Sequence, residues 1–549
     1  MTVRRIMGIE TEYGVLAPGD PGANPMLLSA QVVTAYAADG VPGGAHARWD
    51  YQDEDPLCDA RGWRVDRSAA HPSQLTDREL VGSDGEVEPG LGEDAGPGAD
   101  IGSWQVTARN RATAAPDTEV ISNVILPNGA RYYVDHAHPE YSGPEVTNPR
   151  DAIIWDKAGD EIALRSTRLL AQRPGMPEVA LYKNNTDGKG ASYGTHENYL
   201  MDRRVRFADV ITMLLPFLAT RPVVTGAGRV GLGQSSEGAG FQLSQRADFI
   251  EADVGLETTL RRPIVNTRDE PHADAQRFRR LHVIVGDANQ MEVPIYLKLG
   301  TTSLVLWLLE QEGVRPQLAS LALADPVAAA RAVSHDLTLT QPLDLADGRQ
   351  MTAIEIQRQY LEAVSAGLAQ YPAPEAANAH ADTSADVLRR WSNLLERLAQ
   401  DPSDCAREVE WVAKLRVLEG MRRRDQLDWR HPRLAALDLQ WSDLRPERSV
   451  YHKLVAAGAV ERLVTDADID RALTHPPADT RAYFRGECIR RFGPQVSSAN
   501  WDAVIFDIPG RRQLQRVPTP DPYRGTASQL ADLFERVTGP EHLLQALAG

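Results

Sequence analysis

The chain has 549 residues, of which 42% are hydrophobic and 25% are charged, as in a globular protein of two to four domains. Its net charge of −17 argues against a general nucleic-acid binder, because such proteins present basic surfaces to phosphates. Three separated cysteines, no secretory signal and no run of about 18 apolar residues favour a cytoplasmic protein without disulfides or membrane contact.

Strands are predicted to dominate the first part of the chain. Alternating polar and apolar residues predict a strand over 5–16, and a helix over 26–38 follows it. Residues 123–145 are predicted to form two strands joined by the turn Pro127-Asn128-Gly129. The further elements predicted up to residue 311 are helices at 152–172, 211–219 and 296–311 and strands at 179–199, 222–232, 241–257 and 279–287.

Residues 77–100 have a composition unlike the rest of the chain. They contain eight acids, one arginine, six glycines and two prolines, and so bury too little apolar surface to offset their ordering entropy. We therefore predict a flexible acidic loop over about 66–120, inserted between structured parts. Composition leaves open whether this loop is a functional lid or a dispensable insertion.

Helices are predicted to dominate from 317 to 420, with a proline- and alanine-rich linker at 372–383 and an amphipathic run at 408–424. Strands first and helices later indicate the α+β class. We divide the chain into a large domain over 1–465 and a small C-terminal domain over 466–549. The elements predicted for the small domain are helices at 480–492 and 527–537 and a strand at 501–507.

Two carboxylates in the first predicted strand are candidates for metal ligands. Glu10 and Glu12 are two residues apart, so a strand presents both on one face. Like charges this close repel unless a cation lies beside them, which indicates a site for a hard cation such as Mg²⁺. A solvent-facing strand edge is the alternative.

A second polar group lies at 131–140. Strand geometry places Arg131, Tyr133 and Asp135 on one face, and His136, His138 and Glu140 follow at once. Arginine can bind a phosphate in a forked geometry, and a carboxylate at a strand end can act as nucleophile or base. Turn capping is the alternative for aspartate and histidine at strand ends.

Three further polar residues lie on predicted strands: His196, Arg246 and His282. A lone histidine in a strand is more often structural than catalytic, but His282 has arginines beside it. The glycine pattern at 226–231 leads into a loop and not a helix, which argues against dinucleotide binding, and a phosphate-binding P-loop is absent from the sequence. These patterns predict an antiparallel sheet that cradles Mg²⁺ and a nucleotide, for phosphoryl transfer or amide-bond chemistry.

Long strings of the sequence resemble the Pup ligase/depupylase family, among them IMGIETEYGV, NGARYYVDHAHPEYSGPE and LYKNNTDGKGASYGTHENYL. The resemblance implies a catalytic domain related to glutamine synthetase. One branch of the family ligates the C-terminal glutamate of the small protein Pup to lysines. The other cleaves that isopeptide bond and deamidates Pup that ends in glutamine. The acidic insertion and the string DHAHPE are similar to the cleaving branch, whereas IMGIETE is closer to the ligases.

The resemblance also implies ATP and Mg²⁺ as cofactors, Pup and pupylated proteins as partners, and we expect a monomer. It implies catalytic roles for Asp135, Arg246 and His282; nucleotide contacts for Arg131, Gly143 and Trp501; and metal binding for Glu10, Tyr133 and Glu140. Geometry adds Glu12 and His196 as ligands of a second metal. The nucleophile is left open between Asp135, a retained phosphate and water. A ligase and a non-catalytic Pup-binding module are the rival functions.

The C-terminal tail of Pup is acidic, so a basic groove is expected for it. The candidate groups are Arg203, Arg204 and Arg206, or Arg277, Arg279 and Arg280, with a solvated charged face as the alternative for both.

Overall fold

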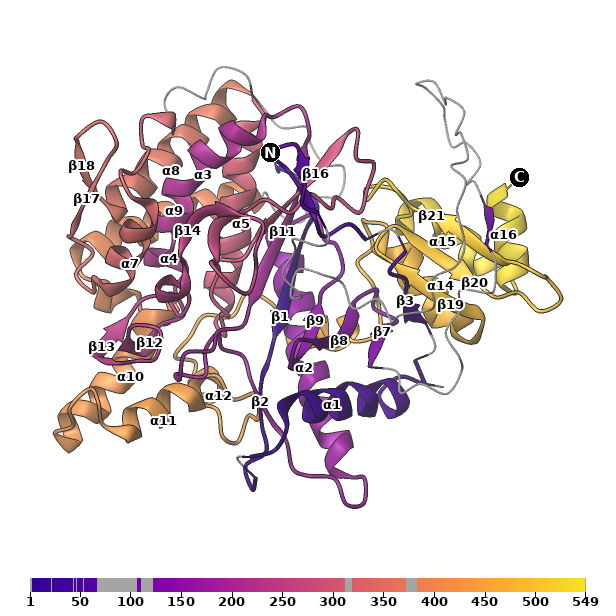
Figure 1. Cartoon of the computed structure of the whole chain (residues 1–549), viewed down its shortest axis with the longest axis horizontal. Helices are drawn as coiled ribbons and strands as arrows, with labels where there is room; N and C mark the ends of the chain where they lie inside the picture. Colours follow the sequence, from indigo (N-terminus) through magenta and orange to yellow (C-terminus); the bar gives the residue numbers. More distant parts are fainter. Residues whose placement is uncertain are drawn as a thin grey trace.

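The computed structural model describes residues 2–548 apart from 21, 43, 46, 53, 67–105, 110–121, 312–317 and 372–382. Most of the predicted acidic loop and of the predicted linker lies outside the described residues. The loop prediction is wrong for Thr107–Arg109, which form strand β6 because they pair with the strand Leu514–Pro518. The described elements confirm the α+β class: a long sheet runs through the molecule, with a helical layer beside one end and a small mixed region at the other (Figure 1).

Among the described residues, eleven strands form one sheet in the order β16-β11-β1-β9-β8-β7-β3-β19-β20-β21-β6. Neighbouring strands are antiparallel except for the parallel pair β3–β19. The strands of the half that carries the candidate residues are β1 (Met7–Glu12), β3 (Arg48–Trp49), β7 (Asn123–Ile125), β8 (Arg131–Asp135), β9 (His138–Ser142), β11 (Thr195–Asp202) and β16 (Phe278–Val283).

Two helices cover the apolar face of the central strands. Helix α1 (Pro25–Asp39) begins at Asn24, and helix α2 (Pro149–Ala171) begins at Asn148. In both, the asparagine side chain accepts hydrogen bonds from the first backbone N–H groups, and proline occupies the first helical position. Tyr132 of β8 packs between them and is fully buried, so β8 turns its odd-numbered residues to the other face.

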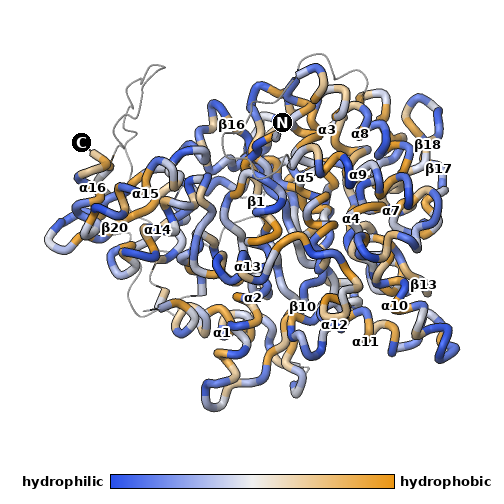
Figure 2. The backbone as a smooth tube through the Cα atoms, turned by 180° about the vertical axis from the view of Figure 1, so that it is seen from behind, coloured by the Kyte–Doolittle hydropathy of each residue, from blue (hydrophilic) through white to orange (hydrophobic). Residues whose placement is uncertain are grey.

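A helical layer forms the largest core and buries α5 (Glu292–Leu309) at its centre (Figures 1 and 2). Helix α5 is the one helix of the described chain with the length and hydropathy to cross a membrane, and 94% of it is buried inside the protein, as in a core helix. The other helices from this region to residue 472 are α3 (Phe207–Thr220), α4 (Pro222–Thr225), α7 (Pro326–His335), α8 (Ala353–Gln370), α9 (Thr383–Gln400), α10 (Glu410–Asp425), α11 (Pro432–Trp441), α12 (Val450–Ala456) and α13 (Asp466–Ala472).

Short strands lie outside the half-sheet that carries the site. Strands β14 and β15 pair in parallel, and the remaining pairs are antiparallel. They are β2 (Gly14–Leu16), β4 (Cys58–Asp59), β5 (Trp63–Arg64), β6 (Thr107–Arg109), β10 (Ala180–Tyr182), β12 (Arg229–Leu232), β13 (Gly238–Gln242), β14 (Ala252–Gly255), β15 (Pro263–Asn266), β17 (Pro342–Asp344) and β18 (Gln350–Thr352).

The C-terminal region has a hydrophobic core of its own but shares the main sheet through β3 and β19. The elements of this region, yellow in Figure 1, are α14 (Ala482–Phe492), β19 (Val496–Asn500), β20 (Ala503–Phe506), β21 (Leu514–Pro518), α15 (Ala527–Arg536) and α16 (Pro540–Ala548). The boundary between residues 465 and 466 stays a prediction.

Several predicted elements are wrong in detail. Residues 5–16 form two strands, and 123–145 contain three. The third strand, β9, forms because it pairs with β8, although its Pro139 has no N–H group to donate. Residues 222–225 are helical because Pro222 starts α4 directly after α3. Trp501 lies in a turn rather than a strand, since the Asn500 side chain accepts a hydrogen bond from the Asp502 backbone at 3.1 Å.

Candidate active site

The polar face of the central strands carries a cluster of carboxylates and histidines. We call this cluster the cradle; its residues are Glu10, Glu12, Asp135, Glu140, His196 and His282. Along β1, Ile9 and Thr11 are buried against the core, and Glu10 and Glu12 point to the opposite face, as predicted. In the sheet register Glu12 lies opposite Glu140, and Glu10 lies opposite His196. Directly opposed side chains in antiparallel strands are close neighbours, so residues from the three strands β1, β9 and β11 meet here.

Two groups of side chains in the cradle have metal-ligand spacing. The ligand atoms of Glu12, Asp135 and Glu140 all lie within 4.8 Å of one another, and so do those of a second group, Glu10, His196 and His282. Tyr133 belongs to the first group, because its hydroxyl donates to Glu140 Oε1 at 2.6 Å. The sheet therefore brings together every residue that was predicted to bind metal.

The charges of the first group are poorly compensated by protein alone. Burial raises the pKa of Glu140 well above its ordinary value, and the negative charges of Asp135, Glu10 and Glu12 raise it further. A divalent cation would relieve this repulsion, since hard cations prefer clustered carboxylate oxygens. The donor set therefore fits Mg²⁺.

Glu10 and Asp135 are stabilised as anions. Burial alone would raise the pKa of Glu10, but the hydrogen bond with His196 and the charge of Arg280 outweigh it and lower that pKa. For Asp135 burial is likewise outweighed, mainly by His136, and its pKa lies below the ordinary value. Asp135 is thus a carboxylate at neutral pH, with 36% of its side chain exposed to an incoming group.

His282 points into the cradle as a neutral imidazole. Burial lowers its pKa well below the ordinary value, and the charge of Arg280 and the neighbouring His196 lower it further. Its Nδ1 lies 2.9 Å from the Asn198 Oδ1 atom, which can only accept, so Nδ1 carries the proton. Its Nε2 is therefore left as an acceptor or ligand atom.

Arg246 is also a cradle neighbour, but it does not lie on a strand as predicted. It precedes a short 3₁₀ helix because the buried Asp287 carboxylate accepts hydrogen bonds from the backbone of Gln245 and Arg246. Its guanidinium donates to Ser192 Oγ at 2.7 Å and to two carbonyls.

The guanidinium of Arg246 carries a charge that the protein leaves largely uncompensated. Its Nε is buried without a hydrogen-bond partner, and among the described residues no carboxylate forms an ion pair with it. Burial and then the charge of Arg262 lower the pKa of Arg246 to about 10. A buried cation of this kind suits an anionic ligand group.

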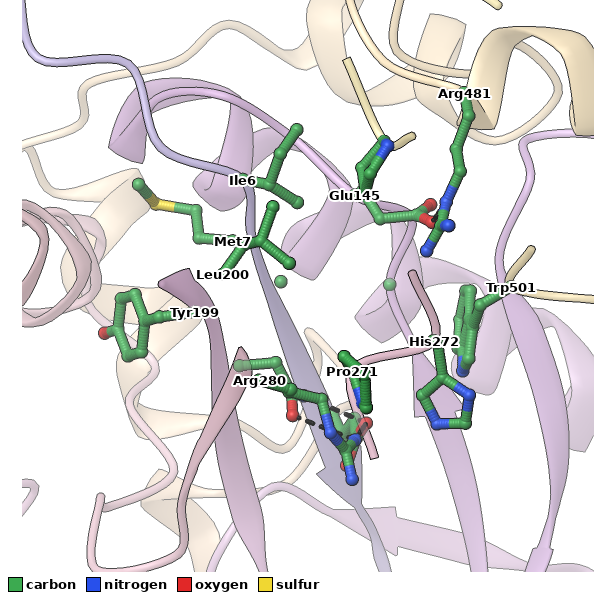
Figure 3. Close-up of a pocket in the computed structure, with 15 residues that line it drawn as sticks. Ile6, Met7, Glu145, Tyr199, Leu200, Pro271, His272, Arg280, Arg481 and Trp501 are labelled. Atoms are coloured by element: carbon green, nitrogen blue, oxygen red, sulfur yellow. Dashed lines mark hydrogen bonds and ion pairs between the residues drawn. The ribbon is translucent and has the colours of Figure 1, made fainter. Parts of the chain in front are cut away.

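A pocket adjoins the cradle, between β1 and the C-terminal region (Figure 3). Gly143 and Trp501, two of the three residues predicted to contact a nucleotide, line it, but the third, Arg131, does not. The Arg131 guanidinium lies 3.6 Å from the Tyr133 ring centroid and 4.1 Å from that of Trp49, which packs edge-on against Trp501. Arg131 thus lies between Tyr133, at the cradle, and Trp49, which contacts the pocket residue Trp501.

A family model described as Pup-ligase protein matches residues 5–505 of this chain. The chain belongs to this family. A relative from Acidothermus cellulolyticus named depupylase is 51% identical over 547 residues, which are 100% of both chains. A relative from Mycobacterium tuberculosis named Pup deamidase/depupylase is 48% identical over 548 residues, 99% of both chains.

Two solved structures of the Pup ligase PafA also match. The complex of PafA with Pup has a TM-score of 0.74 and 32% identity, covering 97% of this chain and 92% of that chain. PafA in complex with ADP has a TM-score of 0.68 and 37% identity, covering 75% of this chain and 90% of that chain.

Several side chains beside the candidate site were not among the predicted catalytic, nucleotide-binding or metal-binding residues. Asn198 and Arg280 alternate on the same strand faces as His196 and His282, and Arg280 was predicted only as a candidate for the Pup groove. His272 and Glu145 line the pocket from loops, for which the sequence offers no periodic signal.

Neither candidate basic group forms a continuous groove in the described chain. Arg203 pairs with Asp269 at 2.8 Å, and Arg206 pairs with Asp209 at 2.7 Å. The second group is divided, since Arg280 lines the pocket and Arg279 is buried. The Pup-binding surface is therefore not assigned to either group.

Proposed function

We propose that this chain is an ATP-dependent depupylase, which hydrolyses the isopeptide bond between the C-terminal glutamate of Pup and a lysine of a conjugated protein. We propose that it also deamidates a C-terminal glutamine of Pup. The observation that carries the choice of branch is the full-length identity of 51% and 48% with depupylases, against 32% and 37% with the ligase structures.

The carboxylates of the cradle support a bound Mg²⁺ held by Glu10, Tyr133 and Glu140, with Glu12 and His196 as ligands of a second metal. When bound, the cation neutralises these carboxylates and the phosphates of ATP. The ADP complex of PafA supports a nucleotide in the adjoining pocket. The residues assigned to nucleotide contact are Arg131, Gly143 and Trp501.

Asp135 is assigned to the bond-breaking step. Hydrolysis adds the oxygen of water to the carbonyl carbon and returns a proton to the departing lysine amine. An ionised Asp135 can attack that carbon itself, orient a bound phosphate that attacks, or take the proton from an attacking water. Arg246 is assigned to the negative charge that develops on the carbonyl oxygen or a phosphate. His282, whose Nε2 carries no proton, is assigned to the same step as a proton acceptor or ligand.

The rival readings are a Pup ligase and a non-catalytic Pup-binding module. A ligase would use the same cradle and consume ATP, so the geometry alone does not separate the two branches. A binding module has no need for closely packed carboxylates beside an ionised Asp135, which argues against it. We further propose a cytoplasmic monomer, which size-exclusion chromatography with light scattering would test.

The deciding experiment is incubation of the purified chain with a Pup-conjugated protein, ATP and Mg²⁺. We expect free Pup and the unmodified protein to appear, and Pup ending in glutamine to be converted to the glutamate form. Formation of conjugates from free Pup and protein would instead identify a ligase. If neither reaction occurs, the result would favour a non-catalytic Pup-binding module.

Removing one carboxylate of the cradle should weaken nucleotide binding. We expect Glu10→Gln and Glu140→Gln each to lower the affinity for ATP in the presence of Mg²⁺ by about tenfold or more, because each loses an anionic oxygen ligand. Isothermal titration calorimetry at fixed Mg²⁺ measures this. Glu362→Gln, on the exposed face of α8, is the matched control. Unchanged affinity in both cradle variants would make these glutamates structural.

A further inference from the structure

The hairpin between β8 and β9 has a turn of only two residues, His136 and Ala137, because Asp135 pairs with His138. His136 adopts a positive φ of 53° in this turn. The first loop residue of such a hairpin is a position where glycine is favoured, since a Cβ atom is strained there. Histidine adopts this conformation more often than most residues other than glycine, and here it places the side chain directly after the proposed catalytic residue.

The imidazole of His136 lies against Asp135. Its Nδ1 is 3.0 Å from Asp135 Oδ2, and 48% of the His136 side chain is exposed, so core packing does not hold the ring in place. Among the described residues, His136 is the only one that forms a hydrogen bond or ion pair with this carboxylate. The conformation of the turn therefore places the Nδ1 atom of His136 next to the Oδ2 atom of Asp135.

The other histidine of the hairpin has a different environment. His138 Nδ1 lies 3.1 Å from the Tyr13 carbonyl oxygen, and its ring stacks on Tyr193 with centroids 4.3 Å apart. These contacts explain His138 as part of the packing between β9 and its neighbours.

We propose that His136 is a positioning residue for Asp135. An Nδ1–H group that donates to Oδ2 fixes the carboxylate plane and leaves Oδ1 directed into the cradle, where the carbonyl carbon is attacked. This deepens the proposed hydrolysis and rests on it. The arrangement parallels other catalytic pairs, in which the reacting side chain is oriented by a third group. Misplacing a reacting atom by about 1 Å can lower a rate by about 100-fold.

Two substitutions separate positioning from turn formation. His136→Gly suits the positive φ, so we expect its melting temperature to equal or exceed that of the wild type. We expect its kcat for release of Pup to fall about 10-fold to 100-fold, with KM for the conjugate and ATP affinity unchanged. His136→Asn tolerates the same φ and keeps an N–H donor, so it should recover a large part of the lost rate.

Crystal structures of the wild type and His136→Gly give a readout that does not depend on activity. We expect a single Asp135 orientation with the Nδ1 contact in the wild type, and a rotated or multiply oriented carboxylate in the glycine variant. The same single orientation in both structures, or equal kcat values in an active enzyme, would overturn the proposal. A wild type that releases no Pup would instead refute the proposed function, while the two structures would still decide the role of His136.

Discussion

Replacing Asp135 with asparagine should abolish the release of Pup, lowering the rate by about 10³-fold or more. The amide has the shape of the carboxylate but no charge, so it can neither attack a carbonyl carbon nor take a proton. ATP affinity should persist, because the residues assigned to nucleotide contact are others. The melting temperature should stay the same or rise, since one of the charges that crowd Glu140 is removed.

The assay is single-turnover cleavage of a Pup conjugate, followed by gel electrophoresis, with ATP affinity and melting temperature measured on the same preparation. Asp347→Asn is the matched control, because Asp347 is exposed in the hairpin between β17 and β18 and pairs only with Arg349 among the described residues. Cleavage by Asp135→Asn within a few-fold of the wild-type rate would remove Asp135 from the reaction.

The faces of the site could be predicted from the sequence because strand periodicity is local. Alternation alone places Glu10 with Glu12, and Arg131 with Tyr133 and Asp135, and the structure confirms both faces. The pairing of Glu12 with Glu140 could not be predicted in this way. It depends on β9, whose Pro139 argues against a strand because it has no N–H group to donate.

Contacts between distant segments account for what the sequence did not reveal. Arg246 leaves the predicted strand because Asp287, 41 residues away, accepts a hydrogen bond from its backbone. Glu145 lies in the pocket wall and contacts Arg481, 336 residues away, and no periodic pattern links such positions. Long-range pairing of this kind is decided by tertiary packing and not by local propensity.

Glu145 should contribute strongly to stability, because it connects the loop after β9 to helix α14. Its two partners are Arg485, in α14, and Arg481, the residue directly before α14. Its carboxylate pairs with Arg481 at 2.7 Å and with Arg485, and all three side chains are largely buried. Burial alone would raise the pKa of Glu145, but the charges and hydrogen bonds of the two arginines outweigh it and lower the pKa to about 2. A shift of this size from about 4.5 corresponds to about 3 kcal/mol of unfolding free energy.

We therefore expect Glu145→Gln to lower the unfolding free energy at pH 7 by about 3 kcal/mol, because two buried guanidinium groups lose their counter-charge. The folded-state pKa lies below the unfolded one, so the ion pair contributes fully above about pH 4.5, and its contribution is lost as the pH falls toward 2. The difference between wild type and variant should accordingly shrink on acidification.

Urea unfolding of both proteins between pH 7 and pH 3.5 measures this difference, and the change in ATP affinity reports on the pocket wall that Glu145 shares with Trp501. Glu178→Gln is the matched control: its ion pair with Arg445 spans 3.0 Å, but 70% of the Glu178 side chain is exposed. Such a surface pair contributes about 1 kcal/mol or less. Equal effects of the two substitutions, or a difference that does not depend on pH, would show that the Glu145 pair does not hold the C-terminal region against the sheet.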